Sequence, residues 1–240
     1  KLVKDKKDLI LAIATPAAQT VANLTKDIPI VASAITDYEG AKLIKSNNEP
    51  GGNLTGTSDM NPIKEQIDLL LKIAPNAKTI GCIYTSSEAN SEIQFKAMKE
   101  YAESKGLKVE SATISNVNDI QQAAQSLVGK VDIFWEPTDN VIASAIPTLV
   151  SVTDAAKKPV ICGEPNMVKN GGLATYGIDY YELGKQSGHM AADILEGKSK
   201  PANMPIQFAK VLKAMFNKTD AAKLGITLSD DLLKDADVVE

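Results

Sequence analysis

The sequence predicts an α/β fold with two Rossmann-like lobes, each a mostly parallel sheet flanked by helices. Short apolar runs alternate with amphipathic segments of helical length, which is the pattern of repeated β-α units. Several runs, such as LILAIA, IPIVA and VDIF, are apolar throughout, as expected of strands that helices cover on both faces. At 240 residues, the chain is long enough for one large domain or two small lobes.

The individual elements follow from this pattern in chain order. Strands are expected at residues 8–14, 30–34, 53–56, 79–84, 108–113, 131–135, 159–162 and 173–176. Helices are expected at residues 17–24, 63–73, 88–105, 117–127, 141–156 and 181–195. In the segment 88–105, Ile93, Ala97 and Tyr101 recur at helical spacing, which predicts one buried stripe on a charged helix.

A break in the pattern at residues 74–78 separates an early group of strands from a later one. Pro75 and Asn76 end a helix there, and a new strand follows. The late helix 181–195 fits best against the early group, so we expect two lobes with interleaved connections. The N-terminal lobe is expected to comprise residues 1–77 and 179–200, and the C-terminal lobe residues 78–178 and 201–240.

Composition argues against several classes of protein. A net charge of −4 and a pI near 5.2 disfavour a nucleic-acid partner, which clustered Lys and Arg would bind. All 26 basic residues are Lys, so arginine clamps for phosphate or carboxylate are lacking. Cys82 and Cys162 lie in apolar runs, which predicts burial and leaves open whether they pair.

The sequence also lacks the parts of common catalytic sites. There is no GxSxG elbow, Walker motif, HExxH or Cys/His cluster, and the single histidine, His189, lies in the middle of an expected helix. We therefore expect no enzyme activity, no cofactor and no metal.

Polar segments follow nearly every expected strand. In open α/β sheets, ligands bind outside the carboxyl ends of the strands, often at helix N-termini. Ser, Thr, Asp and Asn are also the preferred N-cap residues, so capping alone explains any single junction. The junctions lie at residues 15–17, 36–37, 57–59, 85–90, 137–140, 163–165 and 177–180. Together they predict a binding cleft along this edge.

A more specific indication comes from longer strings of the sequence. These are LILAIATPAAQ, PGGNLTGTSDM, NAKTIGCIYTSSEANS, PTDNVIAS and MVKNGGLATYGIDYYELGKQSG. With them, nearly the whole chain resembles the ABC-transporter substrate-binding proteins that take up amino acids, notably tryptophan, tyrosine and phenylalanine. The resemblance implies a type I periplasmic-binding-protein fold, in which the lobes are joined by three hinge crossings and close around a small ligand.

The resemblance also implies a setting for the protein. Members act at the extracellular or periplasmic face, usually as membrane-tethered lipoproteins, and dock on the membrane subunits of an importer. The lipid anchor is absent from this chain, and the usual first β-α-β segment of the family is missing, so we expect a first lobe truncated at its N-terminus. Three alternatives stay open: the sensing domain of a LacI-type regulator, a doubly wound enzyme, and a fragment of the fold that binds no ligand.

Candidate site residues can be assigned by the group of an amino acid that each would bind. With no Arg in the chain, a ligand carboxylate is expected at helix starts, namely Ser86, Ser87 and Asn90 and, in the other lobe, Thr15 and Ala17. For the ammonium the candidates are Asp179 first, then Asp139 and Glu164, with Asp59 and Asp37 in reserve. Thr36, Thr138 and Asn140 complete the polar set, and Trp135, Tyr176, Tyr180 and Tyr84 are candidate aromatic contacts.

Overall fold

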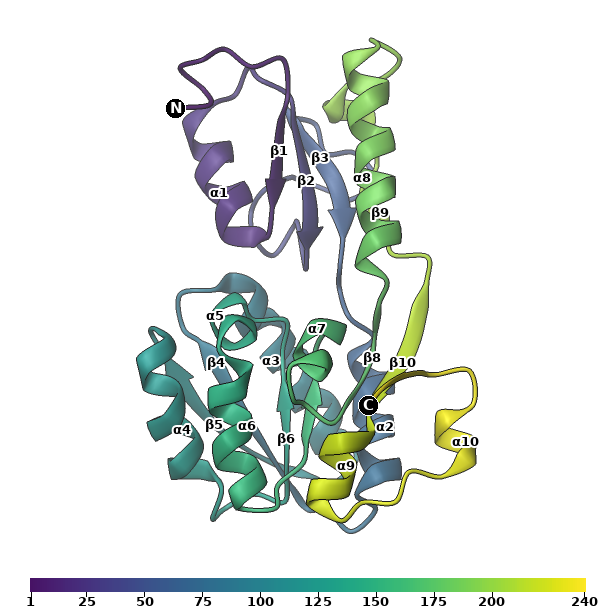
Figure 1. Ribbon diagram of the computed structural model, residues 1–240. Helices are drawn as coiled ribbons and strands as arrows, with labels where there is room; N and C mark the ends of the chain where they lie inside the picture. Colours follow the sequence, from purple (N-terminus) through teal and green to yellow (C-terminus); the bar gives the residue numbers. More distant parts are fainter. The chain divides into compact units, whose positions relative to one another are not determined.

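The strands form two separate sheets, one in each of two units of the chain (Figure 1). The computed structural model describes all residues from 1 to 240. Unit 1 comprises Lys1–Met60 and Ile178–Leu212, and unit 2 comprises Asn61–Gly177 and Lys213–Glu240. The chain therefore passes from one unit to the other at three points.

Unit 1 holds a four-stranded sheet with the order β1-β2-β3-β9 and parallel pairing throughout. Its strands are β1 (Ile10–Ile13), β2 (Ile30–Ile35), β3 (Leu54–Ser58) and β9 (Gln207–Phe208). The helix α1 (Thr15–Leu24) packs on β1 and β2, and α8 (Tyr180–Leu195) packs on β2 and β3. A core that includes Ile30, Ile35 and Leu54 fills the space beside the sheet.

Unit 2 holds a seven-stranded sheet with the order β11-β10-β8-β7-β6-β4-β5. Its strands are β4 (Thr79–Thr85), β5 (Lys108–Ile114), β6 (Ile133–Glu136), β7 (Val160–Cys162), β8 (Ala174–Ile178), β10 (Leu212–Asn217) and β11 (Asp237–Val239). Its helices are α2 (Ile63–Ile73), α3 (Ala89–Ser104), α4 (Ile120–Leu127), α5 (Asn140–Ser144), α6 (Ile146–Ala155), α7 (Pro165–Lys169), α9 (Lys218–Leu224) and α10 (Asp230–Leu233). The α/β architecture with mostly parallel sheets confirms the predicted fold class.

Two expected helices have a different form in the structure. The helix expected at 141–156 is split into α5 and α6 at Ala145, because Pro147 fits the first turn of a helix and not its interior. The helix expected at 117–127 begins as a short 3-10 turn, Val117–Asp119, where Asn116 and Asp119 form a capping box. The elements after residue 200 were not expected from the pattern. Most of them are short, although β10, with the sequence LKAMFN, carries four apolar residues.

Apart from the single residue Ile178, which lies in unit 1, the unit boundaries differ from the expected lobe boundaries in two places. Helix α2 lies in unit 2, where the Gln66 side chain donates to the carbonyl groups of Gly163 and Tyr176. Residues 201–212 lie in unit 1, where β9 pairs with β3 and Thr55 donates to the carbonyl group of Met204. Sequence periodicity does not reveal either set of contacts.

Gly56 permits a close approach between β2 and β3 in unit 1. Its φ of 152° is a conformation that glycine adopts most readily, and an added Cβ would lie 1.7 Å from the Ala32 carbonyl oxygen. The Tyr38 hydroxyl occupies the same place, donating to the carbonyl groups of Ala32 and Thr57 at 2.7 and 3.1 Å. This contact ties the segment after β2 to the end of β3, where candidate site residues lie.

Cys82 and Cys162 are both free and buried in unit 2, which confirms their expected burial. Burial is the main cause that raises the pKa of each thiol well above its usual value. None of the helices combines the length and the apolar character needed to span a membrane.

Candidate functional site

In unit 1, a buried carboxylate lies directly after β3 and receives hydrogen bonds from two hydroxyl groups. Asp59 is 2% exposed. Thr36, which follows β2, donates to its Oδ1 at 3.3 Å, and Tyr180, at the start of α8, donates to its Oδ2 at 2.9 Å. Burial raises the pKa of Asp59, and these two hydrogen bonds act in the opposite direction. Three candidate residues from separate segments therefore meet at this edge.

A cavity of about 260 Å³ lies beside this cluster, within unit 1. Thr36, Tyr38, Ser58 and Phe208 are among the residues that line it. Phe208 ends β9 and is 54% exposed, so its ring is available to a planar ligand. We did not single out Phe208 from the sequence, since one aromatic residue in a segment without clear periodicity gives little signal.

The start of α1 lies at the carboxyl end of β1, with Thr15 buried and Ala17 exposed. No side-chain cap is present at its N-terminus, where Ala14 occupies the cap position and Pro16 the first turn. The first backbone N–H groups of a helix have no partner within the helix. This helix start can therefore bind an anionic group.

In unit 2, the loops after β4 and β6 are joined through one carboxylate. Glu88 accepts hydrogen bonds from the Asn90 side chain at 3.0 Å and from the Asn140 backbone and side chain at 3.1 and 2.7 Å. The carbonyl group of Thr138 accepts from the Asn90 side chain at 2.9 Å. The structure thus brings Asn90, Thr138 and Asn140 together, as expected of residues after neighbouring parallel strands.

Two amide oxygens at this edge are buried without a hydrogen-bond partner, Oδ1 of Asn61 and Oδ1 of Asn90. Each residue is 4% exposed. Asn61 donates through its Nδ2 to the Thr138 hydroxyl, and Asn90 donates to the Thr138 carbonyl group, so both amides converge on Thr138. Leaving a buried acceptor unsatisfied costs about 1–3 kcal/mol, which a donor group of a ligand would offset.

Asn61 was not among the residues selected from the sequence. It stands in SDMNPI, three residues after the last residue of β3 and just before the helix-starting Pro62. A polar residue in such a linker is usually assigned to a turn. Only its contact with Thr138, far away in the sequence, distinguishes it.

The three acidic residues considered first for an ammonium group each cap a helix. Asp139 is fully buried and accepts four hydrogen bonds, two of them from the Thr85 N–H and hydroxyl at 2.7 and 2.8 Å and two from the first turn of α5. Glu164 caps α7 through two N–H groups at 2.7 and 2.8 Å. Asp179 is exposed and caps α8 at 2.9 and 3.0 Å.

The remaining candidates lie in other surroundings. Ser86 donates through its N–H and its hydroxyl to the carbonyl group of Ile114, and Ser87 is exposed. Trp135 is fully buried in the core and donates to Gln66 at 3.0 Å, so it offers no surface to a ligand in this structure. Tyr84 stacks on Phe95 with ring centroids 4.6 Å apart.

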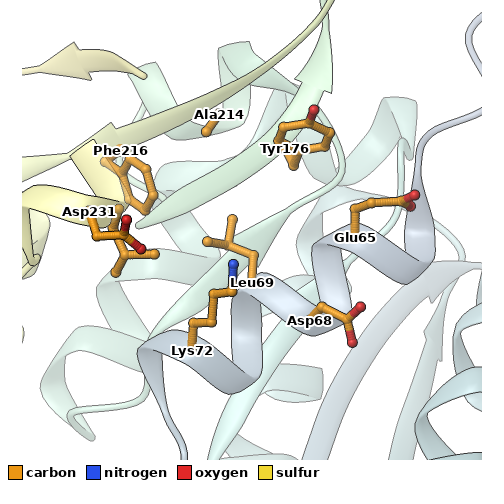
Figure 2. A pocket seen from close by; sticks show the side chains of 9 residues that line it. Glu65, Asp68, Leu69, Lys72, Tyr176, Ala214, Phe216 and Asp231 are labelled. Carbon is orange, nitrogen blue, oxygen red and sulfur yellow. The ribbon is translucent and has the colours of Figure 1, made fainter. Parts of the chain in front are cut away.

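Tyr176, the other aromatic candidate, lines a separate pocket of unit 2 with residues of α2 and α10 (Figure 2). Of the expected aromatic contacts, Tyr180 is therefore the one in the edge cluster of unit 1. His189 is exposed on α8, outside both edge clusters. No group of three or more His, Cys, Asp or Glu side chains has an arrangement that would hold a metal ion.

The model of the family described as ABC transporter substrate binding protein matches residues 1–240. A tyrosine-binding protein from Clostridioides difficile is 47% identical over 199 residues, which cover 83% of this chain and 58% of that protein. The chain thus spans less than two thirds of the length of this relative.

Several solved structures are also similar to this chain. An ABC domain from Streptococcus pneumoniae in complex with L-Trp is 44% identical, with a TM-score of 0.95 over 99% of this chain and 83% of that one. A conserved domain protein from Vibrio cholerae is 38% identical, with a TM-score of 0.96 over 99% of this chain and 80% of that one. A LacI family regulator from Bifidobacterium animalis is 13% identical with a TM-score of 0.61, which shows a shared fold alone.

The strand-end clusters of polar residues, the mostly parallel sheets and the match over the full 240 residues agree with one another. The resemblance noted in the sequence is confirmed. ABC transporter substrate-binding proteins, the class that the family model describes, act outside the cytoplasm. The chain belongs to the ABC transporter substrate-binding protein family and has the type I periplasmic-binding-protein fold.

Proposed function

We propose that this protein binds an L-amino acid with an aromatic side chain and delivers it to an ABC importer. The observation that carries the proposal is the pair of buried acceptors without a partner, Asn61 Oδ1 and Asn90 Oδ1, on two amides whose Nδ2 groups both donate to Thr138. An ammonium group has three N–H donors and no acceptor, so it matches this arrangement. The relatives that bind tyrosine and L-Trp support the choice of ligand class.

The other groups of an amino acid also have suitable partners. Taken by itself, unit 1 offers a partner for a carboxylate at the uncapped start of α1, with Thr15 and the N–H of Ala17. It also offers a partner for an aromatic ring in its cavity lined by Phe208, next to the Asp59 and Tyr180 pair. Asp139, Glu164 and Asp179 are assigned to helix capping, because backbone N–H groups already bind their oxygens.

The proposal is tested by isothermal titration calorimetry with the twenty L-amino acids. We expect saturable binding of tryptophan, tyrosine or phenylalanine and no comparable heat with aliphatic or acidic amino acids. Asn61→Ala and Asn90→Ala should each weaken binding at least about tenfold, since one hydrogen bond to a charged group is worth about 1.5–3 kcal/mol. Asn48→Ala, at an exposed position in unit 1, is the control and should leave the affinity unchanged.

Two results would contradict the assignment. One is unchanged affinity in both Asn61→Ala and Asn90→Ala while the variants remain folded by circular dichroism. The other is saturable binding of a monosaccharide with no response to any amino acid. Asn61→Asp adds a check, because a carboxylate at this position should retain or strengthen ammonium binding.

The delivery step and the location form a further part of the proposal. We infer that the full-length protein is a lipoprotein tethered at the extracytoplasmic face, where it docks on the membrane subunits of an importer. Family membership supports this part. Uptake of labelled tyrosine or tryptophan by cells with and without the gene tests delivery, and labelling with a radioactive fatty acid tests the anchor. Unchanged uptake after deletion would refute delivery.

A further inference from the structure

Unit 2 contains a second pocket outside the edge cluster. It has a volume of about 330 Å³ and lies among α2, β8, β10 and α10 (Figure 2). None of its lining residues belongs to the loops 86–90 and 137–140 that carry Asn90 and Thr138. Its size falls at the lower end of the range for small-molecule sites, roughly 300–1,000 Å³.

The floor of this pocket is apolar and firmly held. Phe216 is fully buried and Leu69 is 8% exposed, so both belong to the packed interior. Tyr176 presents its ring at one side, as Figure 2 shows, and its carbonyl group accepts a hydrogen bond from Gln66 at 3.0 Å. An apolar or aromatic side chain would lose water and gain close contacts on this floor.

The charged residues of the pocket divide into two sets. Figure 2 shows the carboxylates of Glu65 and Asp68 directed away from Phe216, and Asp68 is already bound by the Tyr101 hydroxyl at 3.0 Å and by Lys105 at 3.3 Å. Lys72 of α2 and Asp231 of α10 lie on the Phe216 side. Neither of these two residues takes part in an ion pair of the structure.

We propose that this pocket is a second binding site, specific for a small zwitterion with an apolar side chain, that is, a free apolar or aromatic amino acid. The ligand side chain packs on Tyr176 and on the accessible part of Leu69, and the fully buried Phe216 supports this floor from the interior. Its carboxylate binds Lys72, and its ammonium group binds Asp231. One positive and one negative group beside one apolar floor match the charges of a zwitterion better than those of an amine or an acid alone. Both groups are exposed, so this site binds more weakly than the edge site.

The experiment uses the full chain and compares L-phenylalanine with phenethylamine, which lacks the carboxylate, and 3-phenylpropionate, which lacks the amine. Equilibrium dialysis of labelled phenylalanine up to millimolar concentration should give a stoichiometry of two, with one tight and one weak site. The weak site should bind each of the two analogues at least about tenfold less tightly than phenylalanine.

Variants assign each binding event to a pocket. Lys72→Gln and Asp231→Asn should each remove the weak site and leave the tight site unchanged. Lys64→Gln, another exposed lysine of α2 that does not line the pocket, is the matched control and should leave both sites intact. Asn61→Ala should weaken the tight site and spare the weak one, so failure of the proposed function and failure of this inference are distinguishable.

Three outcomes would overturn the inference. The first is a stoichiometry of one at millimolar phenylalanine in which Asn61→Ala weakens that single site. The second is a weak site that survives in both Lys72→Gln and Asp231→Asn. The third is phenethylamine or 3-phenylpropionate binding as tightly as phenylalanine, which would show that only one of the two charges is recognised.

Discussion

The two units use similar strand ends in different ways. In unit 1, Asp59 follows β3 and is bound by two side-chain hydroxyl groups, which can turn toward a ligand. In unit 2, Asp139 follows β6 and accepts four hydrogen bonds, three of them from backbone N–H groups that cannot turn away. Asp139 of unit 2 is therefore held in a fixed position by the backbone. Asp59 of unit 1 is an adaptable group, meaning one whose hydrogen-bond partners can change.

Two glycines, one in each sheet, differ in what a side chain would meet. In unit 1, the close approach at Gly56 leaves no room for a side chain, because the Ala32 carbonyl group is fixed in β2. In β4 of unit 2, an added Cβ at Gly81 would meet the ring of Phe134 at 2.9 Å. A ring can shift by a few tenths of an ångström more easily than a backbone carbonyl group. The following predictions test these differences, from the largest expected effect to the smallest.

The largest effect is expected for Gly56→Ala. The new Cβ would clash with the Ala32 carbonyl group and with the Tyr38 hydroxyl, and a φ of 152° is unfavourable for alanine. We expect a loss of more than about 4 kcal/mol in the free energy of unfolding, which places this variant among the most destabilising single changes. Urea unfolding followed by circular dichroism measures the loss. Gly52→Ala, where nothing lies within 4 Å, is the control.

Gly81→Ala should cost less than Gly56→Ala, about 1–3 kcal/mol, as is usual for overpacking of a core. An equal cost for the two substitutions would show that Phe134 is as rigid as the backbone of β2. That result would remove the difference between these two glycine sites.

The second effect concerns Asp139 and Asp59. Asp139→Ala removes four hydrogen bonds and leaves buried N–H groups of Thr85 and α5 without partners, so we expect a loss of about 3 kcal/mol or more. Asp59→Ala should cost about 1–2 kcal/mol, because the hydroxyl groups of Thr36 and Tyr180 can find other partners. Thermal unfolding of both variants gives the comparison, and equal losses would contradict it.

Ligand affinity sharpens this second comparison. If Asp59 is the adaptable group, Asp59→Asn should change the affinity for an aromatic amino acid, while Asp139→Asn should act on stability alone. Calorimetry on the two folded variants decides between them. A larger change of affinity in Asp139→Asn would reverse the roles that we assign.

The third effect is a dependence of stability on pH that arises in unit 2. Burial, and after it the neighbouring Asp154 carboxyl, raise the pKa of Asp220 from 3.8 to about 7. Between these two values the folded chain keeps a proton that the unfolded chain releases, so stability is highest below pH 4 for this group and falls as pH rises through 7. The full shift corresponds to roughly 4 kcal/mol, and solvent screening at the partly exposed Asp154 reduces the expected loss between pH 4 and 8 to roughly 2 kcal/mol.

Asp220→Asn isolates this contribution. The amide can still donate to Asp154 but does not titrate, so the variant should be more stable than the parent protein at pH 8 and should lose the slope between pH 4 and 8. Unfolding in urea at each pH measures both quantities. A slope that persists in the variant would assign the titration to another group.

The sequence allowed the prediction of most of the strands and helices, because apolar periodicity follows directly from burial on one or both faces. It did not allow the prediction of the short elements after residue 200, such as β9, whose pairing with β3 depends on distant backbone partners. The candidate site was predicted in part. The meeting of Thr36, Asp59 and Tyr180 is expected of residues that follow strands. The positions of Asn61 and Phe208 in the site depend on contacts with residues far away in the sequence.

The chemistry of the acidic candidates was the least predictable feature. Asp139, Glu164 and Asp179 all follow strands and precede helices, and the same sequence pattern serves a ligand or an N-cap equally well. Burial and the number of donors separate the two roles, and neither quantity can be read from local sequence. Trp135 illustrates the same limit, since its position near a strand end does not reveal the contact with Gln66 that buries its indole N–H.

The smallest effect is expected for Asp179→Ala at the start of α8. Asp179 is exposed and accepts only from the N–H groups of Tyr181 and Glu182, so the variant should lose about 1 kcal/mol of stability, as is usual for an N-cap. Asp179→Ser keeps a capping oxygen and should recover most of this loss. In contrast to Asp59→Asn, neither variant should change the affinity for an aromatic amino acid. A loss of affinity in Asp179→Ala that serine does not restore would show that the Asp179 carboxylate binds the ligand. Unit 1 would then contribute two adaptable acidic groups, Asp59 and Asp179, instead of Asp59 alone.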